Sequence, residues 1–75
     1  MARIVKRLVI CLDNTGYEVS LEKRKIYVAV ADATAERVGH LRVVDESGKG
    51  YLYPKAMFLV AQLPLAQRRA VLHAA

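Results

Sequence analysis

Thiol and imidazole groups, which often serve as nucleophiles, proton carriers or metal ligands, are rare in this chain. They belong to Cys11, His40 and His73, and no two of these residues have a spacing that zinc sites use. A catalytic cysteine would also need an exposed, activated thiol, whereas the apolar neighbours of Cys11 predict a buried side chain. We therefore expect a buried thiol, two surface imidazoles, no metal site and no cofactor.

The adjacent acids Asp45 and Glu46 are the other candidates for catalysis. General acid–base chemistry would need one of them to be buried with a raised pKa. The sequence Asp-Glu-Ser-Gly is instead typical of an exposed turn in which the aspartate bonds to nearby amides. The glycines at 48 and 50 lack the strand-to-helix context of a phosphate-binding loop. The residues therefore predict a protein that is not an enzyme, with both acids in water.

Tyrosines and basic residues indicate binding rather than catalysis, in two alternative ways. A set of aromatic and polar side chains predicts a surface that binds another protein: Tyr27, Arg42, Glu46, Tyr51, Tyr53, Pro54 and Phe58. Basic residues near the first two predicted strands could converge on one edge of the fold and hold nucleic acid: Arg3, Lys6, Arg7, Lys23, Arg24 and Lys25. Solvated charges and half-buried tyrosines would explain both sets without a partner. The tyrosines at 51 and 53 face outward only if Leu52 faces inward, and the sequence leaves this parity open.

The elements that would position these residues are those of a single domain, 1–75. Hydrophobic residues make up 55% of the chain and charged residues 25%, so a packed core is expected. The net charge of +5 permits binding to nucleic acid but does not require it. No segment resembles a targeting signal or approaches the ~20 apolar residues of a membrane span. We expect a cytoplasmic protein without membrane contact, either a monomer or a weak homodimer.

Five segments have the composition of β-strands: 4–12, 25–31, 40–44, 51–53 and 57–61. In the second segment, the period of two places the isoleucine and valines on one face, and Tyr27 with the alanines on the other. The second half of the first segment is apolar on both faces. We therefore expect the C-terminal helix or a second subunit to lie over it.

Turn and helix signals separate the strands. Residues 13–16 form a turn that opens a long polar loop. Asp32 is placed to cap a helical turn over 33–38, and Gly39 suits the left-handed exit from that turn.

The turn at 45–48 makes a tight hairpin and needs a glycine at positive φ, either Gly48 or Gly50. Pro54 ends the fourth strand because it has no N–H to donate, and a single tight turn at 55–56 precedes the fifth. Pro64 suits the first position of a short helix over 65–74.

This order of elements resembles that of an SH3-like barrel. The resemblance covers about 8–61: residues 13–25 as the long first loop, 45–50 as the distal hairpin, and 51–54 followed by Phe58 as the closing segment. It implies an all-β, five-stranded SH3-like barrel, with a C-terminal helical segment at about 64–74. A peptide-binding SH3 domain has paired tyrosines in its first strand and a tryptophan in its third. Both are missing here, so the resemblance does not imply polyproline binding.

Segments 20–27 and 42–54 also resemble a group of short uncharacterised bacterial and phage proteins. The second segment carries the pattern Arg-Val-x-Asp-Glu-Ser-Gly-x-x-Tyr-Leu-Tyr-Pro, and this likeness implies no activity. We predict a non-enzymatic interaction module that binds another protein through a face or an edge of the barrel. Nucleic-acid binding is the alternative.

Overall fold

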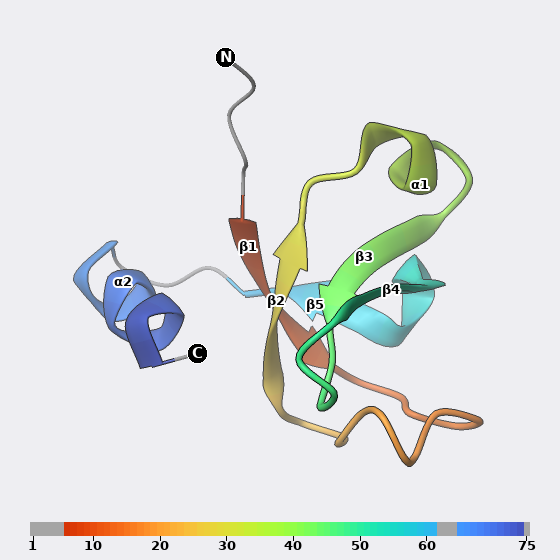
Figure 1. The fold of residues 1–75 in the computed structure, drawn as a ribbon, viewed down its shortest axis with the longest axis horizontal. Coiled ribbons are helices and arrows are strands. Elements are labelled where there is room, and N and C mark those ends of the chain that lie inside the picture. The colour runs from red at the N-terminus through yellow and green to blue at the C-terminus, as the bar shows by residue number, and fades with distance from the viewer. Residues whose placement is uncertain (1–5, 62–64, 75) are drawn as a thin grey trace.

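The computed structural model describes residues 6–61 and 65–74 (Figure 1). Expectations for Arg3, for residues 4–5 and for Pro64 lie outside the described residues, as does the position of the His73 side chain. The described chain forms a five-stranded antiparallel sheet of order β4-β3-β2-β1-β5. Its strands are β1 (Lys6–Cys11), β2 (Ile26–Val30), β3 (His40–Val44), β4 (Gly50–Pro54) and β5 (Phe58–Val60).

Three short helical elements accompany the sheet: α1 (Ala33–Arg37), a 3-10 turn η1 (Lys55–Met57) and α2 (Leu65–Ala74). The prediction of an all-β fold with a short C-terminal helix is confirmed. Among the described helices, none is long and apolar enough to cross a membrane.

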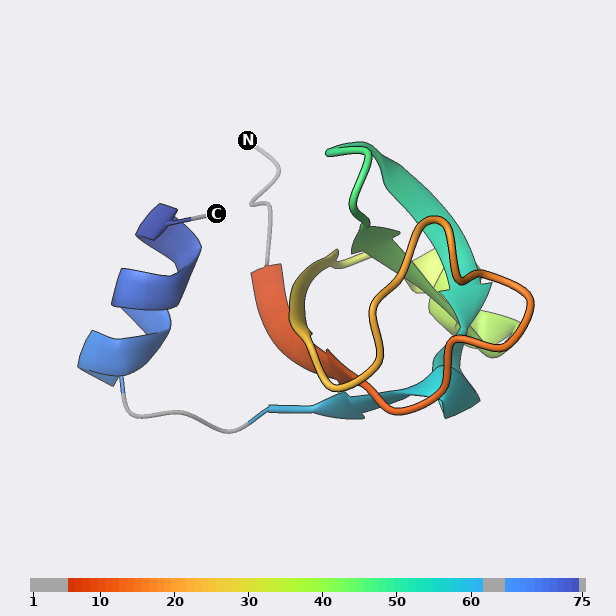
Figure 2. The ribbon, with the colours of Figure 1, turned by 90° about the horizontal axis from the view of Figure 1, so that it is seen from below.

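The sheet curls around a common interior, which gives the molecule a small barrel-like shape (Figure 2). The turn η1 carries the chain from β4 at one edge of the sheet to β5 at the other. Helix α1 lies at one end of the barrel, and the loop that joins β1 to β2 lies at the opposite end (Figure 1). The α1 end and the β1–β2 loop end of the barrel are therefore two separate regions of the surface.

Alternation along each strand selects the side chains that fill the interior. On β2, Tyr27 and Ala29 face inward, and the isoleucine and valines face outward. Cys11 is fully buried as predicted, and burial raises the pKa of its thiol. The buried cluster consists of Val9, Cys11, Leu21, Tyr27, Ala29, Leu41, Val43, Tyr53, Met57 and Phe58.

The predicted caps and turns around β3 are confirmed. Asp32 precedes α1, and its Oδ1 accepts a hydrogen bond from the Ala35 N–H at 3.1 Å. After the helix ends, Gly39 adopts the left-handed conformation, with φ +80°. In the turn between β3 and β4, Gly48 has φ +82° and Gly50 does not have a positive φ. The structure thereby selects one of the two glycines that the sequence allowed.

The other strands differ from their predicted bounds by about one residue at their described ends, and two of these differences have a clear cause. Strand β4 includes Pro54, which is tolerated because β4 is an edge strand with one hydrogen-bonded neighbour. Strand β5 begins at Phe58 because Met57 completes the 3-10 turn. The Ala61 N–H donates to the Leu8 carbonyl at 2.8 Å, so the pairing with β1 continues just past the end of β5.

The outer face of β1 is covered over only part of its length. Leu8 lies opposite Val28 on the outer face, yet it is only 1% exposed. Both ribbon views place α2 beside β1, on the side away from β3 and β4 (Figures 1 and 2). Leu12, next to the end of the same strand, is exposed. The first strand is therefore covered at Leu8 and exposed at Leu12.

Candidate functional site

The structure moves three of the predicted binding residues into the core. Tyr27, Tyr53 and Phe58 are buried, so the prediction that these rings form an outer surface is wrong. Leu52 faces outward opposite Arg42, which sends Tyr53 inward beside Leu41.

The remaining four residues of that set do reach the surface. Tyr51 and Glu46 are exposed, and Arg42 and Pro54 are half-buried. The Arg42 Nε donates to the Asp32 Oδ2 at 2.9 Å, so its charge is paired with the cap of α1. These four side chains do not form one patch with the buried rings.

Hydrogen bonds to the hairpin turn explain why two tyrosines can be buried. The Tyr53 hydroxyl donates to the Asp45 Oδ2 at 2.5 Å and lies 2.9 Å from the Ser20 Oγ. The Tyr27 hydroxyl donates to the Glu46 Oε2 at 2.6 Å and accepts from the Glu22 N–H at 2.6 Å. A buried phenol is stable when its hydroxyl is satisfied in this way. The tyrosines therefore join the β3–β4 turn to the long loop.

The two adjacent acids have different environments, although the sequence predicted that both would be in water. Glu46 is exposed as expected, but Asp45 is only 6% exposed. The predicted local bonding of Asp45 is confirmed, since its Oδ1 accepts from the Ser47 N–H at 2.9 Å and from the Ser47 hydroxyl. Burial by itself raises the pKa of Asp45, but hydrogen bonds from Ser47 and Tyr53 outweigh it and hold the pKa below its usual value.

Glu46 and Lys25 form a short ion pair, with 2.5 Å between the Lys25 Nζ and the Glu46 Oε2. The hydrogen bond from Lys25, followed by the one from Tyr27, lowers the pKa of Glu46. The same contact raises the pKa of Lys25. A carboxylate that is ionised at neutral pH has no proton to donate as a general acid there. This cluster can hold the loop and the hairpin together.

The predicted basic set does not gather on one edge. Lys6 pairs with Val30, whereas Ile10 pairs with Ile26, so Lys25 follows at the far end of the β1–β2 ladder. At about 3.3 Å per residue, Lys6 and Lys25 are separated by roughly 17 Å along the strands. The suggested convergence of the two basic segments does not occur at Lys6 and Lys25, because antiparallel pairing places these residues at opposite ends of the ladder.

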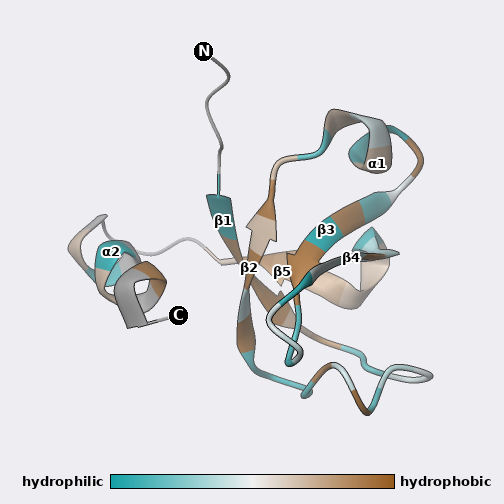
Figure 3. Ribbon diagram, in the orientation of Figure 1, coloured by the Kyte–Doolittle hydropathy of each residue, from teal (hydrophilic) through white to brown (hydrophobic). Residues whose placement is uncertain are grey.

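An exposed apolar row on the outer face of the sheet was missed by the sequence reasoning. Ile10 lies directly between Leu59 of β5 and Ile26 of β2, on the same face. Leu59 is 55% exposed, and Ile26 and the neighbouring Leu12 are also exposed, with α2 in place. Figure 3 shows that β2 is hydrophobic along most of its length. We call Leu59, Ile10, Ile26 and Leu12 the outer stripe.

The signal for the outer stripe was present in the sequence. The first strand is apolar on both faces near its end, and the second carries Ile26 on the face opposite Tyr27. The pairing that aligns these residues could not be read from either segment alone.

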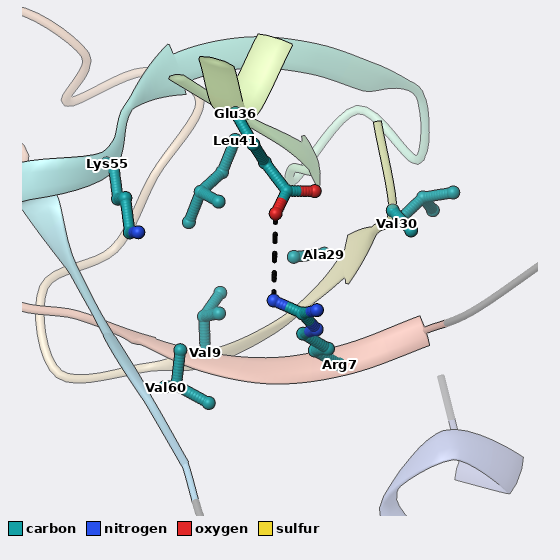
Figure 4. Close-up of a pocket in the computed structure, with 9 residues that line it drawn as sticks. Arg7, Val9, Ala29, Val30, Glu36, Leu41, Lys55 and Val60 are labelled. Atoms are coloured by element: carbon teal, nitrogen blue, oxygen red, sulfur yellow. Dashed lines mark ion pairs between the residues drawn. The ribbon is translucent and has the colours of Figure 1, made fainter. Parts of the chain in front are cut away.

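A small cavity at the α1 end of the barrel is the second feature that the sequence did not reveal (Figure 4). Its volume is about 50 Å³. The Arg7 guanidinium and the Glu36 carboxylate face each other at its mouth, 3.7 Å apart. The lining comes from β1, β2 and the residue after it, α1, β3, η1 and β5: Arg7, Val9, Ala29, Val30, Ala31, Glu36, Leu41, Lys55 and Val60.

The described residues contain no group of three His, Cys, Asp or Glu side chains that could hold a metal ion. His40 is half-buried, and its Nδ1 lies 3.1 Å from the Val38 carbonyl oxygen. Comparisons of the chain with family models, with curated protein sequences and with solved structures found no match.

Proposed function

We propose that this chain is a non-enzymatic interaction module that binds another protein through the outer stripe. The observation that carries the proposal is the alignment of Leu59, Ile10 and Ile26 across three neighbouring strands, with the two outer residues exposed. Contiguous exposed apolar side chains on a small domain are typical of protein interfaces. Because the rings at 27 and 53 are buried, this proposal replaces the tyrosine surface that the sequence suggested.

The strand order supports an SH3-like barrel as the architecture of this module. The first four strands follow one another in the sheet, and β5 returns to pair with β1. The proposal keeps the cytoplasmic location and the protein partner that the sequence predicts. It assigns binding to a face of the sheet, where side chains provide the contact area.

A pull-down from the native cell tests the proposal with three versions of the chain. The wild type is expected to retain a partner that Leu59→Asp loses, because a carboxylate in an apolar contact is strongly disfavoured. Val19→Asp is the matched control, since Val19 is 98% exposed in the long loop and is not one of the outer-stripe residues. The proposal fails if both variants retain the same partners as the wild type, or if no version retains any.

Nucleic-acid binding through the basic residues remains the alternative proposal. The net charge of +5 supports it, but Lys6 and Lys25 lie at opposite ends of the β1–β2 ladder, which weighs against a single contact made by both basic segments. A gel shift with DNA and RNA over a series of salt concentrations distinguishes the two. Phosphate contacts would give binding that weakens steeply with salt, and the lack of any shift at low salt would remove this alternative.

A further inference from the structure

The cavity at the α1 end of the barrel has the features of a small binding site (Figure 4). Its walls come from strands of the sheet together with α1 and η1, so the fold itself forms it. It is separate from the outer stripe, because none of the four outer-stripe residues lines it. A ligand here would define a second surface, independent of the proposed protein-binding face.

The interior of the cavity is apolar and small. Val9, Ala29 and Leu41 are buried core residues, and Val60 adds a further aliphatic side chain at the β5 side. An engineered apolar cavity of about 150 Å³ accepts benzene. A volume of about 50 Å³ is one third of that size and therefore suits a hydrocarbon group of two or three carbons.

The mouth of the cavity has more hydrogen-bond donors than acceptors. The 3.7 Å separation between Arg7 and Glu36 is too long for a hydrogen bond. The other oxygen of Glu36 accepts from the Asp32 N–H at 3.1 Å, which directs this carboxylate toward α1.

Lys55 approaches the same space from the side opposite Arg7 (Figure 4). No carboxylate of the described residues forms an ion pair with Lys55. The mouth therefore carries two cations and one anion, and it favours a ligand with one negative charge.

We propose that this cavity binds a short aliphatic carboxylate, with its hydrocarbon inside and its carboxylate between Arg7 and Lys55. A planar carboxylate matches the two parallel N–H groups of a guanidinium. A free short-chain acid and the C-terminal residue of a peptide with a small aliphatic side chain present this same chemistry. The inference does not depend on the outer stripe.

The first test is a titration of the ¹⁵N-labelled chain, followed by amide chemical shifts, with acetate, propionate and butyrate. Shifts are expected in residues that line the cavity, and each added methylene that enters it should tighten binding about fourfold. Hexanoate should bring no further gain, because its chain exceeds the cavity. Propionamide, which has the same shape without the charge, should bind at least tenfold more weakly than propionate.

Variants separate the site from general charge effects. Lys55→Gln should weaken propionate binding about tenfold, whereas Lys49→Gln, an exposed lysine in the hairpin turn, should leave it unchanged. Ala29→Val fills the cavity and should abolish the dependence on chain length. Because this core change risks the fold, the result with Lys55→Gln decides the test. Equal effects of the two lysine variants, or equal binding of propionate and propionamide, would overturn the proposal.

Peptides distinguish the two sources of the carboxylate. A short peptide that ends in valine with a free C-terminus is compared with the same peptide carrying a C-terminal amide. Tighter binding of the free peptide than of propionate identifies a chain terminus as the ligand, and binding of propionate alone identifies a free acid. Both results support the cavity, whereas binding of the amidated peptide at the same residues contradicts it.

Discussion

At the scale of single residues, the hydrogen bond from the Tyr53 hydroxyl to Asp45 is expected to contribute to the free energy of unfolding. The hydroxyl donates to a buried carboxylate, and the ring of Tyr53 is buried between Tyr17 and Phe58. Burial, followed by the hydrogen bond to Asp45, raises the pKa of this phenol. The hydroxyl therefore stays protonated and remains a donor at neutral pH.

Tyr53→Phe is expected to lower the free energy of unfolding by about 2 kcal/mol, because it leaves the Asp45 carboxylate buried with one donor fewer. Urea denaturation measures the change. Tyr51→Phe is the control, since Tyr51 is exposed on the same strand, and it should shift the midpoint very little. Equal losses in the two variants would show that the hydroxyl of Tyr53 does not stabilise the fold.

Acid should destabilise the protein through Asp45 and Glu46. Both have a folded-state pKa below the ordinary values of 3.8 and 4.5. Their contribution is therefore fully present above the ordinary values and is lost as the pH falls through the lower folded-state values. Urea denaturation between about pH 2 and pH 7 should show stability that falls below about pH 4.5. Asp45→Asn should make this fall shallower, and an unchanged slope would contradict the assignment.

The wrong prediction that Tyr27 lies on the surface has a physical cause. Segment 25–31 offers two faces, and hydrophobicity alone favours burial of the isoleucine and valines. The fold instead buries Tyr27 with the small Ala29, because the hydroxyl of Tyr27 finds Glu46 and the Glu22 amide. Those partners lie in the β3–β4 turn and the long loop. Their positions depend on the tertiary structure, so the sequence pattern could not supply them.

At the scale of elements, local signals were reliable. Strand β3 has the predicted bounds, and Asp32, Gly39 and Gly48 hold the predicted positions. Each of these features depends on hydrogen bonds or φ values within a few residues. The separation of the two basic segments was missed because it depends on the pairing of β1 with β2, 20 residues apart at Lys6 and Ile26.

The cap of α1 gives a prediction at this scale. Asp32→Ala should lower the free energy of unfolding by about 1 kcal/mol, because the Ala35 N–H and the Arg42 guanidinium lose their acceptor. Thermal or urea denaturation measures the change. Thr34→Ala, an exposed position in the first turn, is the control and should have little effect. The role of Asp32 would be contradicted if the two variants were equally stable.

At the scale of the whole molecule, composition and strand spacing were enough to predict a small all-β fold with a terminal helix. They did not predict the outer stripe or the cavity, since each combines side chains from several strands. Leu59 and Ile26 both neighbour Ile10, although 33 residues separate them in the chain. Only the strand order and register bring such residues together.

The burial of Cys11 gives a prediction about opening of the whole fold. Its thiol is fully buried with a raised pKa, so a thiol reagent should react far more slowly than with a free thiol such as glutathione. Reaction would require opening of the structure. The labelling rate should therefore rise with urea and in Tyr53→Phe, by a factor that matches the loss of stability. Fast labelling of the native protein would contradict this burial.

The two edges of the sheet bear on how copies of this chain behave when they are crowded together. Strand β5 is only three residues long, and β4 ends in Pro54, which offers no N–H. At the other end of β4, the Arg42 guanidinium donates to the Gly50 carbonyl at 3.4 Å. A strand from another molecule would therefore meet few backbone N–H and C=O groups with which to pair at either edge. The folded protein should resist conversion to fibrils at concentrations where its valine- and isoleucine-rich segments, once unfolded, would assemble readily.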